Sequence, residues 1–393
     1  MPVTEAQVQR ALASVREPAL RRSVVDLELV RRVRVDGERV EVIMATLEAD
    51  QPGTDAMVAE VRRVVGALDG VAGVDVPVTV LTDTERSALA ARLRHERGTA
   101  AGGMAGRGPE GHDGHDHPNR LGHEEGKPNP FNDPSSTTRV LGISSGKGGV
   151  GKSSVTVNLA VSLARQGKEV GILDADVYGF SIPKMMGIDR DPIVLGDLLV
   201  PPVAFDVRCI SIGFFVEEEQ PIMWRGPMLH KALEQFLVDV QWGTLDYLLI
   251  DMPPGTGDVA LSMAQYLPSS EIYVVTTPQA AAQRVAQRTA YMARKVNLPL
   301  RGVIENMAWF TGDDGTRYTL FGEGGGAMLA AGLGVPLLAQ VPLVPALREG
   351  GDDGCPVTVA DPTGEASLAF EALAKAVDAQ GRARIRRPEL RIS

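Results

Sequence analysis

The sequence predicts an α/β fold, a doubly wound and mostly parallel sheet, preceded by a small α+β domain. Three observations lead to this prediction. A glycine-rich stretch at residues 146–154 lies between an apolar run and a segment of helical periodicity. Residues 138–380 alternate short apolar runs with helical patterns, which is typical of a parallel sheet covered on both faces. Within the first 97 residues, Asp36-Gly37 separates two alternating runs, which is a strong hairpin signal.

Residues 1–97 are expected to form the α+β domain. Thr4 and Gln7 have the spacing of a capping box, which predicts a helix start. Alternating and helical patterns supply the other elements. The expected order is a helix at 5–15, a hairpin at 30–44, a helix at 57–68 and a strand at 76–81.

Residues 98–137 are expected to be a disordered linker, because glycine, proline, histidine and acidic residues replace almost all apolar ones. Its histidines admit two interpretations, loose metal capture or a solvated tether. They are His112, His115, His117 and His123. Residues 381–393 form a basic tail that is too short and too poor in apolar residues for a membrane helix.

The second domain, 138–380, supplies the alternation of strands and helices. Strands are expected at 140–144, 170–174, 247–251, 272–277, 302–306 and 337–340, and helices at 152–166, 228–240, 279–296, 327–333 and 367–379. Asp313-Asp314-Gly315 predicts a further hairpin turn.

Composition excludes several classes of protein. A net charge of −10 argues against a nucleic-acid surface, which requires a basic excess. No apolar run approaches the ~20 residues that span a bilayer, and the first residues do not have the pattern of a secretory signal. We therefore expect a cytoplasmic protein without nucleic-acid or membrane partners. Cys209 and Cys355 form neither a C-x-x-C motif nor a zinc spacing.

The glycine-rich stretch has the strand–loop–helix context of a phosphate-binding loop, the P-loop of NTPases. Backbone N–H groups of such a loop cradle a polyphosphate, the lysine reaches the β- and γ-phosphates, and the hydroxyl that follows holds Mg²⁺. Lys152 and Ser153 occupy these positions. The expected nucleotide-binding residues are Gly146, Lys147, Gly148, Gly149, Val150, Gly151, Lys152, Ser153 and Ser154.

Carboxylates at two strand ends are expected beside this loop, since ligands bind outside the carboxyl ends of parallel strands. Asp174 and Asp176 lie two residues apart in the sequence. We expect one of them to orient the attacking water and the other to reach the Mg²⁺ shell. The alternative is that they cap a strand-to-helix turn. Asp251 ends the apolar run 247–250, which has the form of a Walker-B strand that helps to hold Mg²⁺.

Asn306 ends a later strand, where a base-recognition loop belongs. It either hydrogen-bonds a purine or satisfies a strand-end turn. The sequence lacks the Asn-Lys-x-Asp pattern of a guanine reader, which favours ATP over GTP. Mg²⁺-dependent ATP hydrolysis is the activity that these residues predict together.

A second lysine in the loop, Lys147, resembles the deviant Walker A motif of the superfamily that holds MinD, ParA and the nitrogenase iron protein. The resemblance implies that Lys147 reaches the partner's nucleotide across a homodimer. Within the superfamily the chain is similar to the Mrp/ApbC family. The segments that carry this resemblance are 173–179, 223–228, 251–258, 304–307, 321–326 and 347–352. Residues 1–97 resemble the iron–sulfur assembly domain that often precedes this ATPase.

The resemblance implies ATP-dependent binding of a [4Fe–4S] cluster and its transfer to apo iron–sulfur proteins. The chain departs from the family at two places. The interval 308–319 lacks the family's C-x-x-C, and Gln51-Pro52 stands where the assembly domain has Cys-Pro. Thiolates are the usual ligands of such clusters, so the cluster ligands stay unassigned. The alternative function is a metal-free, nucleotide-dependent dimerisation switch that acts as an interaction or positioning protein.

Overall fold

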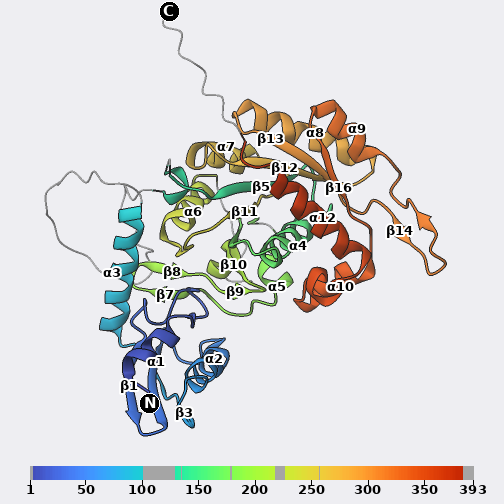
Figure 1. The fold of residues 1–393 in the computed structure, drawn as a ribbon. Helices are drawn as coiled ribbons and strands as arrows, with labels where there is room; N and C mark the ends of the chain where they lie inside the picture. Colours follow the sequence, from blue (N-terminus) through green and yellow to red (C-terminus); the bar gives the residue numbers. More distant parts are fainter. Residues whose placement is uncertain are drawn as a thin grey trace, which may run out of the picture. The chain divides into compact units, whose positions relative to one another are not determined.

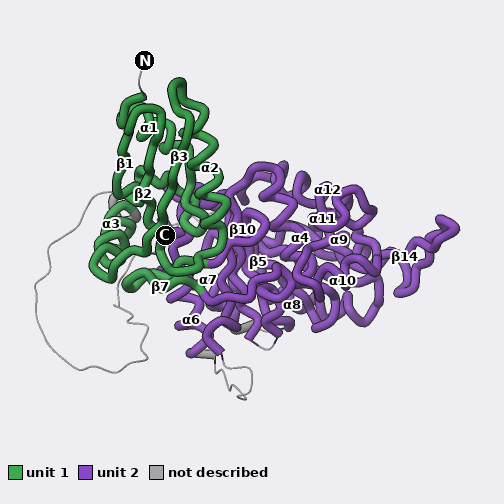
Figure 2. The backbone as a smooth tube through the Cα atoms, turned by 90° about the horizontal axis from the view of Figure 1, so that it is seen from below, with its two compact units in different colours: residues 1–123, 192–201 green, residues 124–191, 202–393 purple. Residues whose placement is uncertain are grey.

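The computed structural model describes residues 3–100, 129–133, 135–177, 179–216, 226–255 and 257–383. The chain divides into two compact units (Figure 2). Residues 1–123 and 192–201 make up the first, and residues 124–191 and 202–393 the second. None of the helices in the described part is long and apolar enough to cross a membrane.

The first unit contains the expected α+β elements. Thr4 caps α1 (Glu5–Leu12), and the reciprocal bonds of a capping box with Gln7 are present. The predicted hairpin forms from β1 (Val30–Asp36) and β2 (Arg39–Thr46), which pair antiparallel. The unit continues with α2 (Thr54–Gly66), β3 (Gly73–Asp75) and β4 (Val78–Val80), and both short strands run parallel to β2.

Two elements of the first unit lie outside the boundaries expected from the sequence. Helix α3 (Asp83–Ala100) runs into the stretch expected to be linker. A hairpin of β7 (Ile193–Leu195) and β8 (Leu198–Val200) comes from the range 138–380, yet its contacts group it with the first unit. Residues 101–128 of the expected linker, with its four histidines, and the tail from residue 384 lie outside the described residues. A short 3₁₀ turn, η1 (Pro130–Asn132), forms within the last part of the expected linker.

The second unit is built on an eight-stranded sheet, and the predicted doubly wound, mostly parallel architecture is confirmed (Figure 1). The strand order is β16-β13-β12-β5-β11-β6-β10-β9, and only β9 runs antiparallel to its neighbour. The strands are β5 (Arg139–Ser145), β6 (Val170–Asp174), β9 (Val203–Ala204), β10 (Val207–Ser211), β11 (Tyr247–Asp251), β12 (Glu271–Thr276), β13 (Leu300–Glu305) and β16 (Leu337–Gln340).

Helices cover both faces of this sheet (Figure 1). One face carries α4 (Lys152–Arg165), α5 (Ile182–Met185), α10 (Pro345–Asp353), α11 (Val357–Ala360) and α12 (Glu365–Ala379). The other carries α6 (Gly226–Asp239), α7 (Gly257–Tyr266), α8 (Ala280–Lys295) and α9 (Gly325–Leu333). Short 3₁₀ turns are η1 (Pro130–Asn132) and η2 (Ile212–Phe215), and the predicted second hairpin forms from β14 (Phe310–Thr311) and β15 (Arg317–Tyr318).

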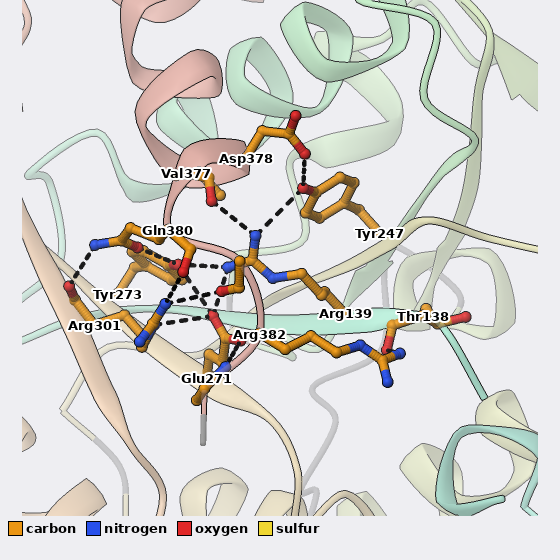
Figure 3. Close-up of polar contacts among 12 residues, drawn as sticks. Thr138, Arg139, Tyr247, Glu271, Tyr273, Arg301, Val377, Asp378, Gln380 and Arg382 are labelled. Carbon is orange, nitrogen blue, oxygen red and sulfur yellow. Dashed lines mark hydrogen bonds and ion pairs between the residues drawn. The ribbon is translucent and has the colours of Figure 1, made fainter. Parts of the chain in front are cut away.

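A buried ionic cluster closes the sheet at the starts of its strands, opposite the end that carries the glycine loop (Figure 3). Glu271 Oε2 lies 2.7 Å from Arg139 Nη2 and 3.3 Å from Arg301 Nε. Arg139 Nη1 also donates to the carbonyl of Val377, at 2.7 Å, and Glu271 Oε1 accepts from Ala383 N. The buried carboxylate therefore joins the starts of β5, β12 and β13 to the end of α12.

Candidate nucleotide-binding site

The glycine loop joins β5 to α4 in the predicted strand–loop–helix arrangement. Gly149 and Gly151 both adopt φ of 78°, in the left-handed region that favours glycine. Gly151 is the N-cap of α4, so the free N–H groups of this helix begin at the end of the loop. Gly146 packs against α8: a Cβ there would lie 2.8 Å from Ala286 Cα and closer still to Ala286 N and Val285 C.

Asp251 is the centre of the site. It ends β11, is fully buried, and accepts hydrogen bonds at both carboxylate oxygens. Oδ2 accepts from Lys152 Nζ at 2.5 Å and from Ser153 Oγ at 2.7 Å. Oδ1 accepts from Thr156 Oγ1 at 2.7 Å. The structure thus brings together three side chains expected from the sequence, and it adds Thr156 to them.

Asp174 and Asp176 lie on the next strand of the sheet. The register of β6 and β11 sets Asp174 beside Asp251. Asp174 is fully buried, and its oxygens accept from Ser211 Oγ at 2.9 Å and from Asp176 N at 3.2 Å. Burial, with the charge of Asp251, raises the pKa of Asp174 to about 8, although Lys152 opposes the shift. Asp176 Oδ2 lies 3.5 Å from Lys152 Nζ.

Lys147 lies in the glycine loop and Asn306 follows β13, and both contact other groups of the protein. Lys147 Nζ donates to Gln279 Oε1 at 3.1 Å. Asn306 is fully buried, and its Nδ2 donates to the carbonyl of Val150 at 2.9 Å. Within the described part of the chain, Asn306 Oδ1 has no hydrogen-bond partner. Asn306 therefore supports the loop backbone and keeps one buried acceptor unpaired.

Three polar residues of the site were not anticipated from the sequence. Thr156 lies one helical turn after Lys152 on the same face of α4, so the i, i+4 spacing was an available signal. Ser211 ends β10, a strand that was not expected. Gln279 precedes α8, and nothing in its local sequence indicates a contact with Lys147.

Comparison with known proteins identifies the family. Residues 136–378 match the family described as NUBPL iron-transfer P-loop NTPase, and residues 5–76 match the iron–sulfur cluster assembly protein family. The iron–sulfur cluster carrier protein of Mycobacterium leprae is 42% identical over 90% of this chain and 88% of its own length. The chain belongs to the iron–sulfur carrier family of P-loop NTPases.

Other members and neighbours agree with this assignment. The carrier protein of Synechocystis is 36% identical over 95% of this chain and 97% of its own length. Among solved structures, a nucleotide-binding protein from Archaeoglobus fulgidus in complex with ADP is 35% identical, with a TM-score of 0.52. That comparison covers 60% of this chain and 93% of the Archaeoglobus chain. The predicted resemblance to this ATPase family and to the assembly domain is therefore confirmed.

This family member has an unusual set of candidate cluster ligands. Its sequence contains two cysteines. Cys209 is fully buried in β10, where burial raises the pKa of its thiol, and Cys355 is half-buried. Across the described residues, no group of three or more histidine, cysteine or acidic side chains is placed to hold a metal ion. The described side chains do not fit the four-thiolate ligation typical of a [4Fe–4S] cluster.

Hydrogen-bonded structure occupies both places where family cysteines were expected. Glu365 accepts from Trp309 Nε1 and Thr311 Oγ1, both at 2.9 Å, and pairs with Arg317 at 3.1 Å, which fixes the β14–β15 hairpin. In the first unit, Gln51 Oε1 accepts from Leu47 N at 3.0 Å, and Gln51 Nε2 donates to the buried Glu17. Hydrogen bonds within the chain therefore hold both segments in place.

Proposed function

We propose that this protein is a Mg²⁺-dependent ATPase. The observation that supports this most strongly is the convergence of Lys152, Ser153 and Thr156 on the buried carboxylate of Asp251. The loop N–H groups of residues 146–154 and the Lys152 ammonium would hold the β- and γ-phosphates. The loop N–H groups and the lysine ammonium would stabilise the negative charge that develops on the transferred phosphoryl group.

Ser153 and Asp251 fit a magnesium ion. A hydroxyl and a carboxylate are hard oxygen ligands, and Mg²⁺ is usually bound through one or two carboxylates together with substrate phosphates. Ser153 Oγ and Asp251 Oδ2 lie 2.7 Å apart, which is close enough for both oxygens to contact the same ion. When bound, the ion would neutralise charge on the phosphate oxygens.

We assign orientation of the attacking water to Asp176 and a supporting role to Asp174. Asp174 is fully buried, and both of its oxygens accept hydrogen bonds from protein groups. Asp176 is 7% exposed and lies within reach of Lys152. A water-orienting carboxylate must reach the solvent side of the site, and Asp176 is the better placed of the two. We assign the contact with the purine base to Asn306, whose Oδ1 is a buried acceptor without a hydrogen-bond partner among the described residues.

Replacement of Lys152 by alanine tests the ATPase proposal. We expect phosphate release to fall by about 100-fold or more, because one contact to developing charge typically contributes that much. Lys375→Ala is the matched control, since Lys375 is an exposed lysine of α12 that pairs with Glu371. Phosphate release is measured with and without Mg²⁺. Equal rates for wild-type protein and Lys152→Ala would contradict the proposal.

The active form that we propose is a homodimer in which Lys147 acts on the partner's nucleotide. In the described part of the chain the Lys147 ammonium donates to Gln279 Oε1, and in the family that the deviant loop resembles such a lysine reaches across the interface. Lys147→Ala should lower the hydrolysis rate while ADP still binds. The rate per subunit of wild-type protein should rise with protein concentration; independence from concentration would argue against the dimer.

The cellular role that we propose is nucleotide-dependent delivery of iron–sulfur clusters to apoproteins in the cytoplasm. Relatives named iron–sulfur cluster carrier protein, similar over about nine-tenths of the chain, support this role. Anaerobic reconstitution followed by iron counting tests it directly. A wild-type protein that retains iron, and loses it with Cys355→Ser, would identify the half-buried cysteine as a ligand.

A second candidate is a metal-free nucleotide switch, which the small number of thiols favours. Under this alternative the reconstituted protein contains no iron, and nucleotide changes only its partners. A pull-down with and without ATP separates the two roles, because a delivery protein should enrich apo iron–sulfur proteins and a positioning switch should not.

A further inference from the structure

The first strand of the β7–β8 hairpin has the alternating burial of a strand packed on one side. Ile193 and Leu195 are 4% and 0% exposed, whereas Val194 between them is 56% exposed. On the second strand Leu198, Leu199 and Val200 are all buried. Gly196 turns the chain with φ of 65°. The hairpin therefore has one apolar face that must be covered by other residues.

The first unit covers this face. Four buried residues of the hairpin share one apolar cluster with Leu89, Ala90 and Leu93 of α3 and with the core of β1, β2, α1 and α2. They are Ile193, Leu195, Leu198 and Val200. A Cβ on Gly196 would lie 3.1 Å from Ala90 Cβ, so the turn fits closely against α3. The hairpin is thus part of the core of this unit.

Two polar contacts fix the position of the hairpin on α3. Arg94 Nη1 lies 2.6 Å from Asp197 Oδ2 at the turn. Arg86 Nη2 donates to the carbonyl of Val194 at 2.7 Å. The two arginines lie about two turns apart along α3, so the helix holds both the edge and the turn of the hairpin.

The same hairpin is covalently continuous with the second unit at both ends. The chain enters it after α5, which follows Asp174 and Asp176, and leaves it into β9 and β10, which ends at Ser211. We propose that the β7–β8 hairpin is a docking element by which the ATPase chain holds the N-terminal unit. The unit is then retained without the chain between residues 101 and 128. This inference goes beyond the proposed function and does not depend on hydrolysis.

A cleavable full-length protein tests the proposal. A specific protease site is placed between residues 114 and 115, the protein is cleaved, and the fragments are run on a size-exclusion column at about 1 µM, where a sub-micromolar complex stays intact. We expect the fragments to elute together. If the two fragments of the wild-type protein elute separately, the proposal is overturned.

Two substitutions in the same strand then locate the contact. Leu195→Asp places a charge in the apolar core and should weaken association of the cleaved fragments by about 100-fold or more, so that they separate. Val194→Asp is the matched control on the exposed side and should leave them together. ADP binding by the C-terminal fragment, measured in parallel, reports whether the ATPase part remains folded. Co-elution of the Leu195→Asp fragments would refute the proposal.

A charge reversal provides a milder test. Arg94→Glu sets two carboxylates against each other at the hairpin turn and should weaken association of the cleaved fragments. Adding Asp197→Arg restores an opposite-charge pair and should recover it. Failure of the double variant to recover any association would contradict the placement of the hairpin on α3. Loss of ATP hydrolysis in any of these proteins would concern the proposed function alone.

Discussion

Replacing Gly146 by alanine should destabilise the second unit, because α8 leaves no space for a methyl group. The new Cβ would lie 2.8 Å from Ala286 Cα and closer still to Ala286 N and Val285 C, whereas ordinary contact begins at 3.4 Å, so the helix must retreat by more than ~0.6 Å. A gap of that size forfeits about a quarter to a half of a dispersion contact. It would open under the buried alanines of α8, which are Ala282, Ala286, Ala290 and Ala293.

The expected cost is about 3 kcal/mol, at the upper end for an overpacked site, because the obstacle is helix backbone and not a flexible side chain. Urea denaturation without nucleotide measures it. Gly148→Ala, in the same loop, is the control: its Cβ meets no atom within 4 Å and its φ is not positive, so its stability should change by less than about 0.5 kcal/mol. If both variants unfold at the wild-type midpoint, the close packing of the loop on α8 is refuted.

Three further predictions follow from the site and the β14–β15 hairpin. Asp174 keeps its proton up to about pH 8 when folded but only to about pH 4 when unfolded, so the free energy of unfolding falls between these pH values. Asp174→Asn should remove this fall. In EDTA the difference in free energy of unfolding between this variant and the wild type should therefore grow from pH 5 to pH 8, by at most about 4 kcal/mol; parallel profiles would contradict it. Thr156→Val leaves Asp251 Oδ1 unpaired and should raise the Mg²⁺ concentration for half-maximal hydrolysis about 10-fold, while ADP binding without Mg²⁺ is retained. Hydrogen bonds from Trp309 and Thr311 and the nearby Arg317 hold the pKa of Glu365 below its usual range although burial opposes them. Its stabilising effect therefore exists above about pH 4.5 and disappears in more acid solution. Glu365→Gln should cost about 1 kcal/mol at pH 7, and this cost should shrink as the pH falls below about 4.5, followed by Trp309 fluorescence.

The parts of the fold that were predictable are those set by local chemistry. The glycine loop needs glycine at fixed positions and a lysine at its end, and apolar runs mark the strands β5, β6, β11, β12, β13 and β16. Strand β10 was missed because Arg208 and Cys209 interrupt its apolar pattern. In the structure Arg208 pairs with Glu169 at 2.8 Å, which allows an arginine in a buried strand.

Other elements depend on contacts between distant segments, which local patterns do not record. The first residues of α3 are polar, and its buried face becomes visible only when the hairpin of residues 193–200 covers it. The same holds in the site. Lys152, Ser153 and Asp251 were expected together, but the bond from Ser211 to Asp174 requires the register of β10 on β6.

The ionic cluster at the starts of the strands has a consequence for synthesis of the protein. Arg139, Glu271 and Arg301 are synthesised before several of their partners, which include the carbonyls of Val377 and Gln380 and the N–H of Ala383, in and just after α12. Until those residues leave the ribosome, buried charges in the sheet lack part of their hydrogen bonding, which is costly. This end of the sheet is therefore completed only after residues 377–383 have left the ribosome.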